Sequence, residues 1–474
     1  MSLNVHLGAA GLRNYSSFGV PSPLMLMFVM PMFPGNTPKA MRRQLYMDLA
    51  HGIKAVNWWP VITFESGWNN CAIDYREYAE HPPGAMFLEM RRCMAEVSGF
   101  DDIIYSGYRG THARVALMYS ETGDIWGAAN VQAMQNTTAS LGQRSSFVPP
   151  RDCTGTLGSG KRTLFLALRH AELVVDIVIE DDAVAGELSR YSVVFLADPA
   201  VSAAATAGLA GYVRNGGTLF ATASAGLLTE HNQTNAPMLE LLGIEETGRN
   251  TGSRGANDTI SLGKMDLPWA ETLDTVELAG GSSNSSLDVF GLQSAFSLAG
   301  QPTPTVLAKF GTGSPAVVRR DVGRGHAVYA GFLPGLSYFH AALPREMPVD
   351  RGASDSSGSH FIPHKFATPA RDAVLVGMAG LAEDKLARPV RCSEPLVDAG
   401  FIDANKTGSA VVLSNWSGRE RIDDLVVTVD VPGLAFTNVS LASGGRVRVR
   451  SGPSGGSAVF VVGHLSVGDA IILR

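Results

Sequence analysis

The sequence predicts an α/β protein with three successive parts: a partial β/α barrel, a three-layer α/β domain and an antiparallel β-sandwich. Two patterns support this fold class. Short apolar runs alternate with helical segments through the first half of the chain, as in parallel sheets covered by helices. Short β-branched runs separated by turn glycines follow at the end, as in antiparallel sandwiches. With 474 residues, of which 45% are hydrophobic, the chain can bury several cores.

Residues 1–110 are predicted to be the remnant of a β/α barrel. A strand, a helix, a second strand and a second helix are expected within residues 24–29, 38–50, 53–62 and 75–97. Gly52 stands where a glycine commonly ends a helix. A whole barrel needs about 250 residues. We therefore expect either that another chain covers this segment or that the sequence is a fragment of a longer protein.

Residues 111–388 are predicted to form the three-layer domain. Its expected parallel strands lie at 115–119, 174–179, 191–196 and 218–221, and its expected helices at 164–173, 203–214 and 368–386. Further strands at 305–310, 316–319 and 326–331 either extend this sheet or form a small β-layer on it.

Residues 389–474 are predicted to form the β-sandwich. Strands are expected at 410–413, 425–431, 446–450, 458–462 and 470–473. One of them alternates cleanly, because Val447 and Val449 point to one face while the arginines between and beside them point to the other.

Composition excludes several classes of partner. The net charge of -6 gives no basic surface for nucleic acid. No run reaches the roughly 18 apolar residues of a membrane span, and the 4 cysteines form no CxxC pair. His360 and His364 are four residues apart, but Pro363 disrupts a helix there and no acidic residue lies between them, so no metal site is expected. No other cofactor is expected. Nothing in the sequence indicates a cellular compartment.

Several short motifs occur in an order that resembles a known family. They are HGIKAVNWWP, YREYAE, ARVALMYS, VRNGGTLFATASAGLLTEHN and MLELLGI. In this order the chain resembles the C-terminal part of family 42 glycoside hydrolases (β-galactosidases): the final barrel strand, a linking helix and the trimerisation domain. The likeness covers most of residues 24–245, and the C-terminal sandwich fits the same architecture more loosely. It implies a flavodoxin-like, class I amidotransferase-like fold for the central domain, and a homotrimer.

The resemblance does not extend to the catalytic residues. Retaining glycosidases use two carboxyl groups roughly 5 to 5.5 Å apart. The family's acid/base residue lies on a fourth barrel strand that has no counterpart here. Its nucleophilic glutamate ends the strand that corresponds to residues 24–31, which contain no acidic residue. Asp48 is the only acidic residue before Glu65. We therefore expect no catalytic residues and no glycoside cleavage by the standard mechanism.

A carbohydrate site can still be expected at the end of the last barrel strand. By analogy with the family, Trp58 and Trp59 could stack on a sugar ring, and Glu65 could bind its hydroxyl groups. The alternative is that one tryptophan belongs to the barrel core and the other packs under the following loop.

Two further motifs are interpreted as loops. The turn at residues 221–226 lacks the cysteine of an active amidotransferase, and Ser224 beside Glu230 and His231 is a weak candidate for a serine triad. The segment GTLGSGKRT at residues 155–163 imitates a phosphate-binding loop, but Arg162 replaces the Ser or Thr that would bind magnesium. We interpret it as a solvated loop.

Two functions remain open. The first is a glycoside-hydrolase-related protein without catalytic carboxylates, a fragment or an inactive relative, with carbohydrate binding possible. The second is a structural protein that forms a homo-oligomer and has no sugar chemistry. An upstream coding sequence with an Asn-Glu pair on a predicted strand would favour the first.

Overall fold

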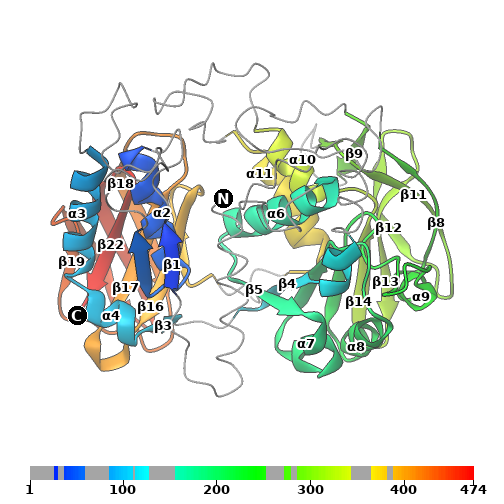
Figure 1. Ribbon diagram of the computed structural model, residues 1–474, viewed down its shortest axis with the longest axis horizontal. Helices are drawn as coiled ribbons and strands as arrows, with labels where there is room; N and C mark the ends of the chain where they lie inside the picture. Colours follow the sequence, from blue (N-terminus) through cyan, green and yellow to red (C-terminus); the bar gives the residue numbers. More distant parts are fainter. Residues whose placement is uncertain are drawn as a thin grey trace, which may run out of the picture. The chain divides into compact units, whose positions relative to one another are not determined.

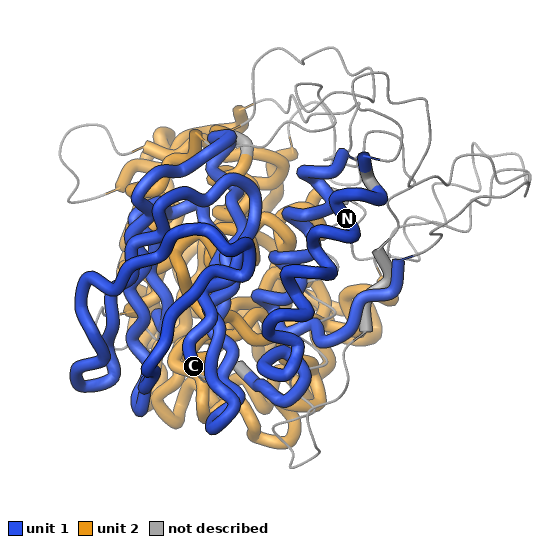
Figure 2. Tube along the Cα trace, turned by 90° about the vertical axis from the view of Figure 1, so that its left-hand side faces the viewer, with its two compact units in different colours: residues 1–112, 344–364, 387–474 blue, residues 113–343, 365–386 orange. Residues whose placement is uncertain are grey.

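The chain folds as two units whose boundaries do not follow the order of the sequence. In the computed structural model, unit 1 comprises residues 1–112, 344–364 and 387–474, and unit 2 comprises residues 113–343 and 365–386 (Figures 1 and 2). The structure describes residues 26–29, 37–58, 85–109, 113–126, 155–251, 272–278, 286–342, 365–381 and 388–474.

The N-terminal part of unit 1 alternates strands and helices. Its elements are β1 (Leu26–Val29), α2 (Pro38–Ala50), β2 (Ala55–Trp58), α3 (Ala85–Val97), α4 (Asp101–Ser106) and β3 (Tyr108–Arg109). β1 and β2 pair in parallel, so the predicted strand, helix and strand are confirmed. The Thr37 side chain caps α2 by accepting a hydrogen bond from the Ala40 amide, and Pro38 occupies the first turn.

The C-terminal part of unit 1 is an antiparallel sandwich. Its strands are β15 (Val390–Cys392), β16 (Val397–Asp403), β17 (Ser409–Asn415), β18 (Ile422–Asp430), β19 (Val439–Leu441), β20 (Val447–Ser454), β21 (Ser457–Leu465) and β22 (Gly468–Leu473). One sheet has the order β15-β18-β21-β20 and the other β19-β22-β17-β16-β3. The second sheet takes β3 from the N-terminal part, which the sequence did not predict.

The five-stranded sheet is buried on both faces. Along β17, Val411 and Leu413 face the four-stranded sheet, and Ala410 and Val412 face the helices. β22 alternates in the same way. The helices supply Leu45, Tyr46 and Leu49 from α2, Cys93 from α3, and Ile103 and Ile104 from α4. Unit 1 therefore has three layers: a sheet, a second sheet and a layer of helices.

Two glycines allow α2 to approach this sheet closely. A Cβ atom at Gly400 in β16 would lie 1.9 Å from the Ala50 carbonyl oxygen, and one at Gly468 would lie 2.8 Å from Tyr46 Cβ. Arginines of α2 complete the contact. Arg42 donates to the Gly468 carbonyl oxygen, and Arg43 donates to the Asn415 carbonyl oxygen.

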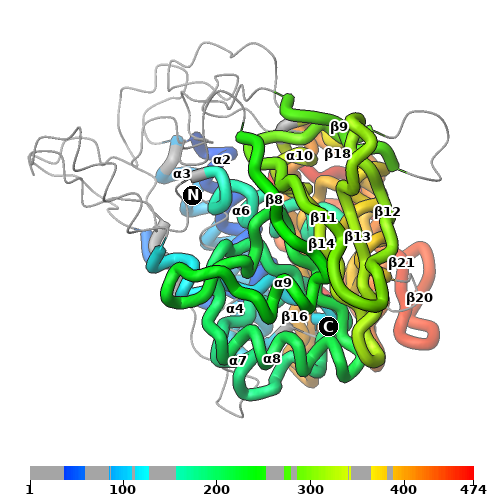
Figure 3. The backbone as a smooth tube through the Cα atoms, turned by 90° about the vertical axis from the view of Figure 1, so that its right-hand side faces the viewer, coloured from blue at the N-terminus to red at the C-terminus, as the bar shows by residue number. Residues whose placement is uncertain are grey.

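Unit 2 is built on a nine-stranded mixed sheet with the order β10-β9-β12-β13-β14-β7-β6-β4-β5. The parallel strands are β4 (Val115–Tyr119), β5 (Val175–Ile179), β6 (Val193–Leu196), β7 (Thr218–Ala221) and β14 (Gly325–Ala330). The antiparallel strands β9 (Asp274–Leu278), β10 (Ser286–Val289), β12 (Thr305–Phe310) and β13 (Pro315–Val322) extend it (Figure 3). Of the two placements open for the later strands, extension of the central sheet is the correct one.

Helices cover both faces of this sheet. They are α6 (Gly155–His170), α7 (Glu180–Val184), α8 (Ala203–Arg214), α9 (Ala236–Leu242), α10 (Pro334–His340) and α11 (Thr368–Arg371). Val194 and Leu196 of β6 pack in one core with α8 and α9. Figure 1 shows α6 and α10 on the opposite side of the sheet from α7 and α8. A separate pair, β8 (Ile244–Asn250) and β11 (Gln293–Leu298), is antiparallel. The predicted three-layer α/β fold is confirmed.

Two predictions about the helices of unit 2 were wrong. Residues 155–163 are not a solvated loop, because α6 begins at Gly155 and Lys161 is buried. The expected helix at 368–386 is shorter. Helix α11 continues as a π-helix at Asp372–Met378, which ends before Gly380, a residue with a left-handed φ of 70°.

The substitution Gly400→Ala should destabilise unit 1, because its methyl group would overlap the Ala50 carbonyl oxygen and push α2 from the sheet. We expect a loss of about 3 kcal/mol, measured by urea unfolding of the full chain. Gly452→Ala is the control, since no atom lies within 4 Å of a Cβ there. Equal effects of the two substitutions would contradict the role of Gly400.

Candidate functional site

Trp58, the first predicted sugar-binding residue, is the last residue of β2 and pairs with Val29 of β1. It is partly buried and packs against Met41 of α2 and Met90 of α3. This contact agrees with the alternative in which one tryptophan belongs to the core. The other two predicted residues, Trp59 and Glu65, lie outside the described residues, as do His360 and His364.

Asp48, the only acidic residue before Glu65, lies in α2 and is fully buried. Burial raises the pKa of its carboxyl group to about 8, and the neighbouring Gln44 side chain acts in the opposite direction. The carboxyl group is therefore largely protonated at neutral pH and has no access to solvent. It does not replace either carboxylate of a glycosidase.

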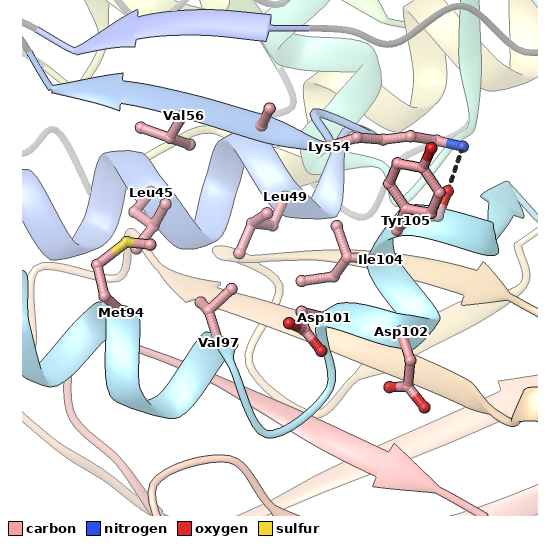
Figure 4. Close-up of a pocket in the computed structure, with 11 residues that line it drawn as sticks. Leu45, Leu49, Lys54, Val56, Met94, Val97, Asp101, Asp102, Ile104 and Tyr105 are labelled. Atoms are coloured by element: carbon pink, nitrogen blue, oxygen red, sulfur yellow. Dashed lines mark hydrogen bonds between the residues drawn. The ribbon is translucent and has the colours of Figure 1, made fainter.

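A pocket of about 510 Å³ opens beside β2. Figure 4 shows side chains from α2, β2, α3 and α4 around it. Its walls are mainly apolar, and its charged residues are Lys54, Asp101 and Asp102. Two of these are engaged: the Lys54 ammonium donates to the Tyr105 carbonyl oxygen, and Asp102 pairs with Arg474. Trp58 does not line this pocket.

In unit 2, polar residues gather where parallel strands end. The chain passes from β4 outward to β5, and then returns to the other side of β4 for β6 and β7. Ligands of such sheets bind in the crevice at this reversal, outside the carboxyl ends of the strands. Here Ser120 follows β4, Glu180 follows β5 and Asp198 follows β6.

These residues bind one another and the neighbouring backbone. Lys161 Nζ of α6 lies 2.8 Å from Asp198 Oδ1 and over the Tyr119 ring, 4.5 Å from its centroid. Asp198 Oδ2 accepts from the Ser120 amide. Glu180 accepts from the Ser120 hydroxyl, and its hydrogen bonds lower the pKa of its carboxyl group although burial opposes this. A buried ion pair and its hydrogen-bond partners thus lie at the carboxyl ends of β4 and β6.

Ser224 lies in the turn after β7 and is buried, with a φ of 65°. Its amide donates to the Tyr329 hydroxyl group, and its own hydroxyl is 3.5 Å from Glu246 Oε1. Glu230 has a different role, since its exposed carboxylate accepts from the Ala203 amide at the start of α8. The contacts of Ser224 therefore involve neither Glu230 nor His231, in agreement with the loop interpretation.

Sequence reasoning missed the Lys161–Asp198 pair. The available signal was an acidic residue, Asp198, two residues after an apolar parallel strand, together with the one lysine of the glycine-rich segment. Neither residue is near the other in the sequence, so only the sheet order brings them together.

Two searches of the described residues gave no candidate. No group of three or more His, Cys, Asp or Glu residues there is arranged to hold a metal ion. None of the described helices is long and apolar enough to span a bilayer.

Comparison with known proteins identifies the central domain. Residues 113–347 match the family model described as beta-galactosidase trimerisation domain. No match was found among curated proteins.

Solved structures with the same fold include several glycosidases. The beta-galactosidase from Bacillus circulans sp. alkalophilus is 16% identical with a TM-score of 0.60, and the match covers 99% of this chain and 58% of that one. The beta-galactosidase from Rahnella sp. R3 is 16% identical with a TM-score of 0.60, and the match covers 100% of this chain and 57% of that one. Alpha-L-fucosidase isoenzyme 2 from Paenibacillus thiaminolyticus is 13% identical with a TM-score of 0.56, and the match covers 99% of this chain and 62% of that one. This chain thus spans less than two thirds of each of them.

The fold is therefore that of an α/β protein with the domain arrangement of glycoside hydrolases. Residues 113–347 belong to the beta-galactosidase trimerisation domain family, and the chain as a whole has the fold of the C-terminal part of family 42 β-galactosidases. The predicted resemblance is confirmed.

The substitution Asp48→Asn should stabilise the protein in a pH-dependent way. Because burial raises the pKa of the Asp48 carboxyl group in the folded state, the unfolded chain loses this proton at a lower pH. The free energy of unfolding therefore falls as the pH rises from about 4 to about 8. Asparagine does not titrate, so this decrease in stability is absent from the variant. We expect a gain of a few kcal/mol at pH 8 and little change at pH 4, measured by urea unfolding. Parallel pH profiles for the two proteins would show that Asp48 is not the cause.

The substitution Lys161→Met should destabilise unit 2 at the carboxyl ends of β4 and β6, because it removes the cation that pairs with the buried Asp198 carboxylate. The expected cost is about 3–5 kcal/mol, read from faster amide hydrogen exchange in β4 and β6. Asp198→Asn added to it should recover part of the loss. Arg448→Met is the control, since the pair of Arg448 with Asp424 is exposed and should cost less than about 1 kcal/mol.

Proposed function

We propose that this chain is the non-catalytic, assembly-forming part of a β-galactosidase-like glycosidase and that it forms a homotrimer. The observation that carries the proposal is the match of residues 113–347 to a trimerisation domain. The absence of acidic residues at 24–31 and the burial of Asp48 support the non-catalytic part of it.

We also propose the boundaries of three domains, and the same comparison supports the central one. We assign residues 1–110 to the end of a β/α barrel, because β1, α2 and β2 form a parallel strand-helix-strand unit. Residues 111–388 are then the trimerisation-type domain and residues 389–474 the C-terminal β domain. Lys161 and Asp198 form a buried ion pair at the carboxyl ends of the parallel strands, which supports a role of this domain in assembly rather than in catalysis.

A carbohydrate ligand is proposed for the end of β2, at Trp58, Trp59 and Glu65. The solved proteins with this fold act on different sugars according to their names, galactosides in one case and fucosides in another. The proposal therefore specifies a monosaccharide ring that stacks on an indole, and no particular sugar. The packing of Trp58 against Met41 and Met90 favours the second candidate function, an assembly protein without sugar chemistry.

The purified chain should sediment as a trimer and should release no nitrophenol from a nitrophenyl β-galactoside. Sedimentation equilibrium and an absorbance assay measure these two properties, with the beta-galactosidase from Rahnella sp. R3 as the positive control for activity. Release of galactose that is abolished by changing one Asp or Glu would overturn the non-catalytic assignment. A monomer at micromolar concentration would overturn the assembly role.

Sugar binding is tested by calorimetry with galactose, fucose and their methyl glycosides. Glu65→Gln should weaken binding about tenfold, because it removes a charged acceptor of hydroxyl hydrogen bonds. Trp58→Phe keeps an aromatic ring against Met41 and Met90 and should change the affinity less than Trp59→Ala. An absence of heat with all these sugars would favour the assembly protein without sugar chemistry.

A further inference from the structure

We infer that the outer face of helix α8 is a contact between copies of this chain, with the α8 helices of three copies arranged head to tail around a threefold axis. We call this surface the α8 face. It consists of Val184 of α7 and of Ala203, Ala204, Ala207 and Gly211 of α8. The inference rests on the proposed function in one respect, that this chain forms a homotrimer.

The α8 face is apolar although it is exposed. Val184 is 55% exposed, and the three alanines of the α8 face are exposed as well. Helix α8 contains no charged residue before Arg214, and its one threonine, Thr206, is buried. The outer face of a surface helix normally carries charged or polar side chains, and a helix that is apolar all round is normally buried. We therefore expect a further protein surface to cover the α8 face.

Two glycines of α8 differ in their surroundings. A Cβ atom at Gly208 would lie 2.1 Å from the Ala183 carbonyl oxygen, so the contact between α7 and α8, seen in Figures 1 and 3, requires glycine there. A Cβ atom at Gly211 would have no described atom within 4 Å. Glycine inside a helix is less stable than alanine, and no contact among the described residues offsets this cost at Gly211. Close approach of a second backbone would offset it.

The two ends of α8 carry opposite charges. Glu180, the first residue of α7, accepts a hydrogen bond from the Ser202 amide at the start of α8, which places the exposed Asp181 near this end. At the other end the exposed Arg214 is the last residue of α8, and the amide of the exposed Arg324 donates to its carbonyl oxygen. Each copy therefore offers one acidic and one basic end on the same side of unit 2.

The family match and the charges indicate a second copy as the occupant. Residues 113–347 belong to the trimerisation domain family, and both α7 and α8 lie within this range. In a closed ring of three, each copy contacts one neighbour with one end of a surface and the other neighbour with the other end. The basic end of each α8 then meets the acidic end of the next one, and the apolar centres of the three α8 faces meet at the axis.

Sedimentation equilibrium of the full chain tests the centre of the α8 face. Ala207→Glu places a charge there and should weaken assembly at least tenfold. Alanine and glutamate are both good helix formers, so circular dichroism should show an unchanged helix content. Gly211→Ala should weaken assembly at least threefold, whereas at an uncovered helix position the same change would only stabilise the fold. Ala95→Glu, at an exposed alanine of α3, is the matched control and should change assembly less than twofold.

Charge reversal tests the head-to-tail arrangement. Arg214→Glu and Asp181→Arg should each weaken assembly severalfold, because each brings like charges together between neighbouring copies. The double variant should assemble nearly as tightly as the wild-type chain, because it exchanges the two charges and restores the opposite pairing. A double variant that assembles no better than the weaker single variant would overturn this arrangement.

The outcomes separate this inference from the proposed function. A wild-type trimer that Ala207→Glu and Gly211→Ala leave unchanged would overturn the α8 face and leave the homotrimer in place. A wild-type monomer at micromolar concentration would overturn both. If Ala207→Glu loses helix content, Gly211→Ala decides the inference, because alanine favours the helix and only a covering backbone makes it unfavourable for assembly.

Discussion

The two-sided burial of the five-stranded sheet is the constraint on which unit 1 depends. Strands β17 and β22 are apolar on both faces, so period-two alternation of polar and apolar residues cannot tell the faces apart. The face toward the helices carries Gly400, Ala410, Gly468 and Ala470 beside larger residues such as Val412 and Ile472. At Gly400 and Gly468 the missing side chain leaves room for the Ala50 backbone and for Tyr46. Glycines at these two positions therefore allow α2 to pack closely on this face.

The same principle explains unit 2. Helix α6 begins in a glycine-rich segment with low helix propensity, and close packing with α10 compensates for this. A Cβ atom at Gly335 would lie 2.2 Å from the Leu164 amide, and one at Gly160 would touch Leu333. The packing of α6 also places Lys161 beside Asp198, where the lysine neutralises a buried charge at the sheet edge. The close packing and the buried ion pair thus both follow from the position of α6.

The sequence was sufficient for elements that signal themselves locally. The strands β4 to β7 and β12 to β14 of unit 2, the strands β17, β18 and β20 to β22 of the sandwich, and α8 follow from apolar runs and turn glycines. Helix α2 follows from Pro38 and Gly52. The sequence was insufficient where contacts between residues far apart in the chain determine the structure. Lysine is normally exposed, so only the position of Asp198 could reveal that Lys161 is buried. Arg42 likewise pairs with Glu89 and Glu96 and donates to the Gly468 carbonyl oxygen of β22, and these contacts depend on how α2 packs on the sheet. Trp58 was assigned by analogy, and its packing against methionines could not be read from its neighbours in sequence.

The discontinuity of unit 1 has a consequence for synthesis of the chain. Tyr108 and Arg109 of β3 pair with Asp403 and Ile402 of β16, nearly 300 positions later. During translation the helices α2 to α4 therefore leave the ribosome long before the strands that bury them. Unit 2, whose larger part is the continuous stretch 113–343, can complete most of its sheet in that interval. The face of α2 that packs on β16, β17 and β22 is therefore covered only after the last strands of the chain have been made.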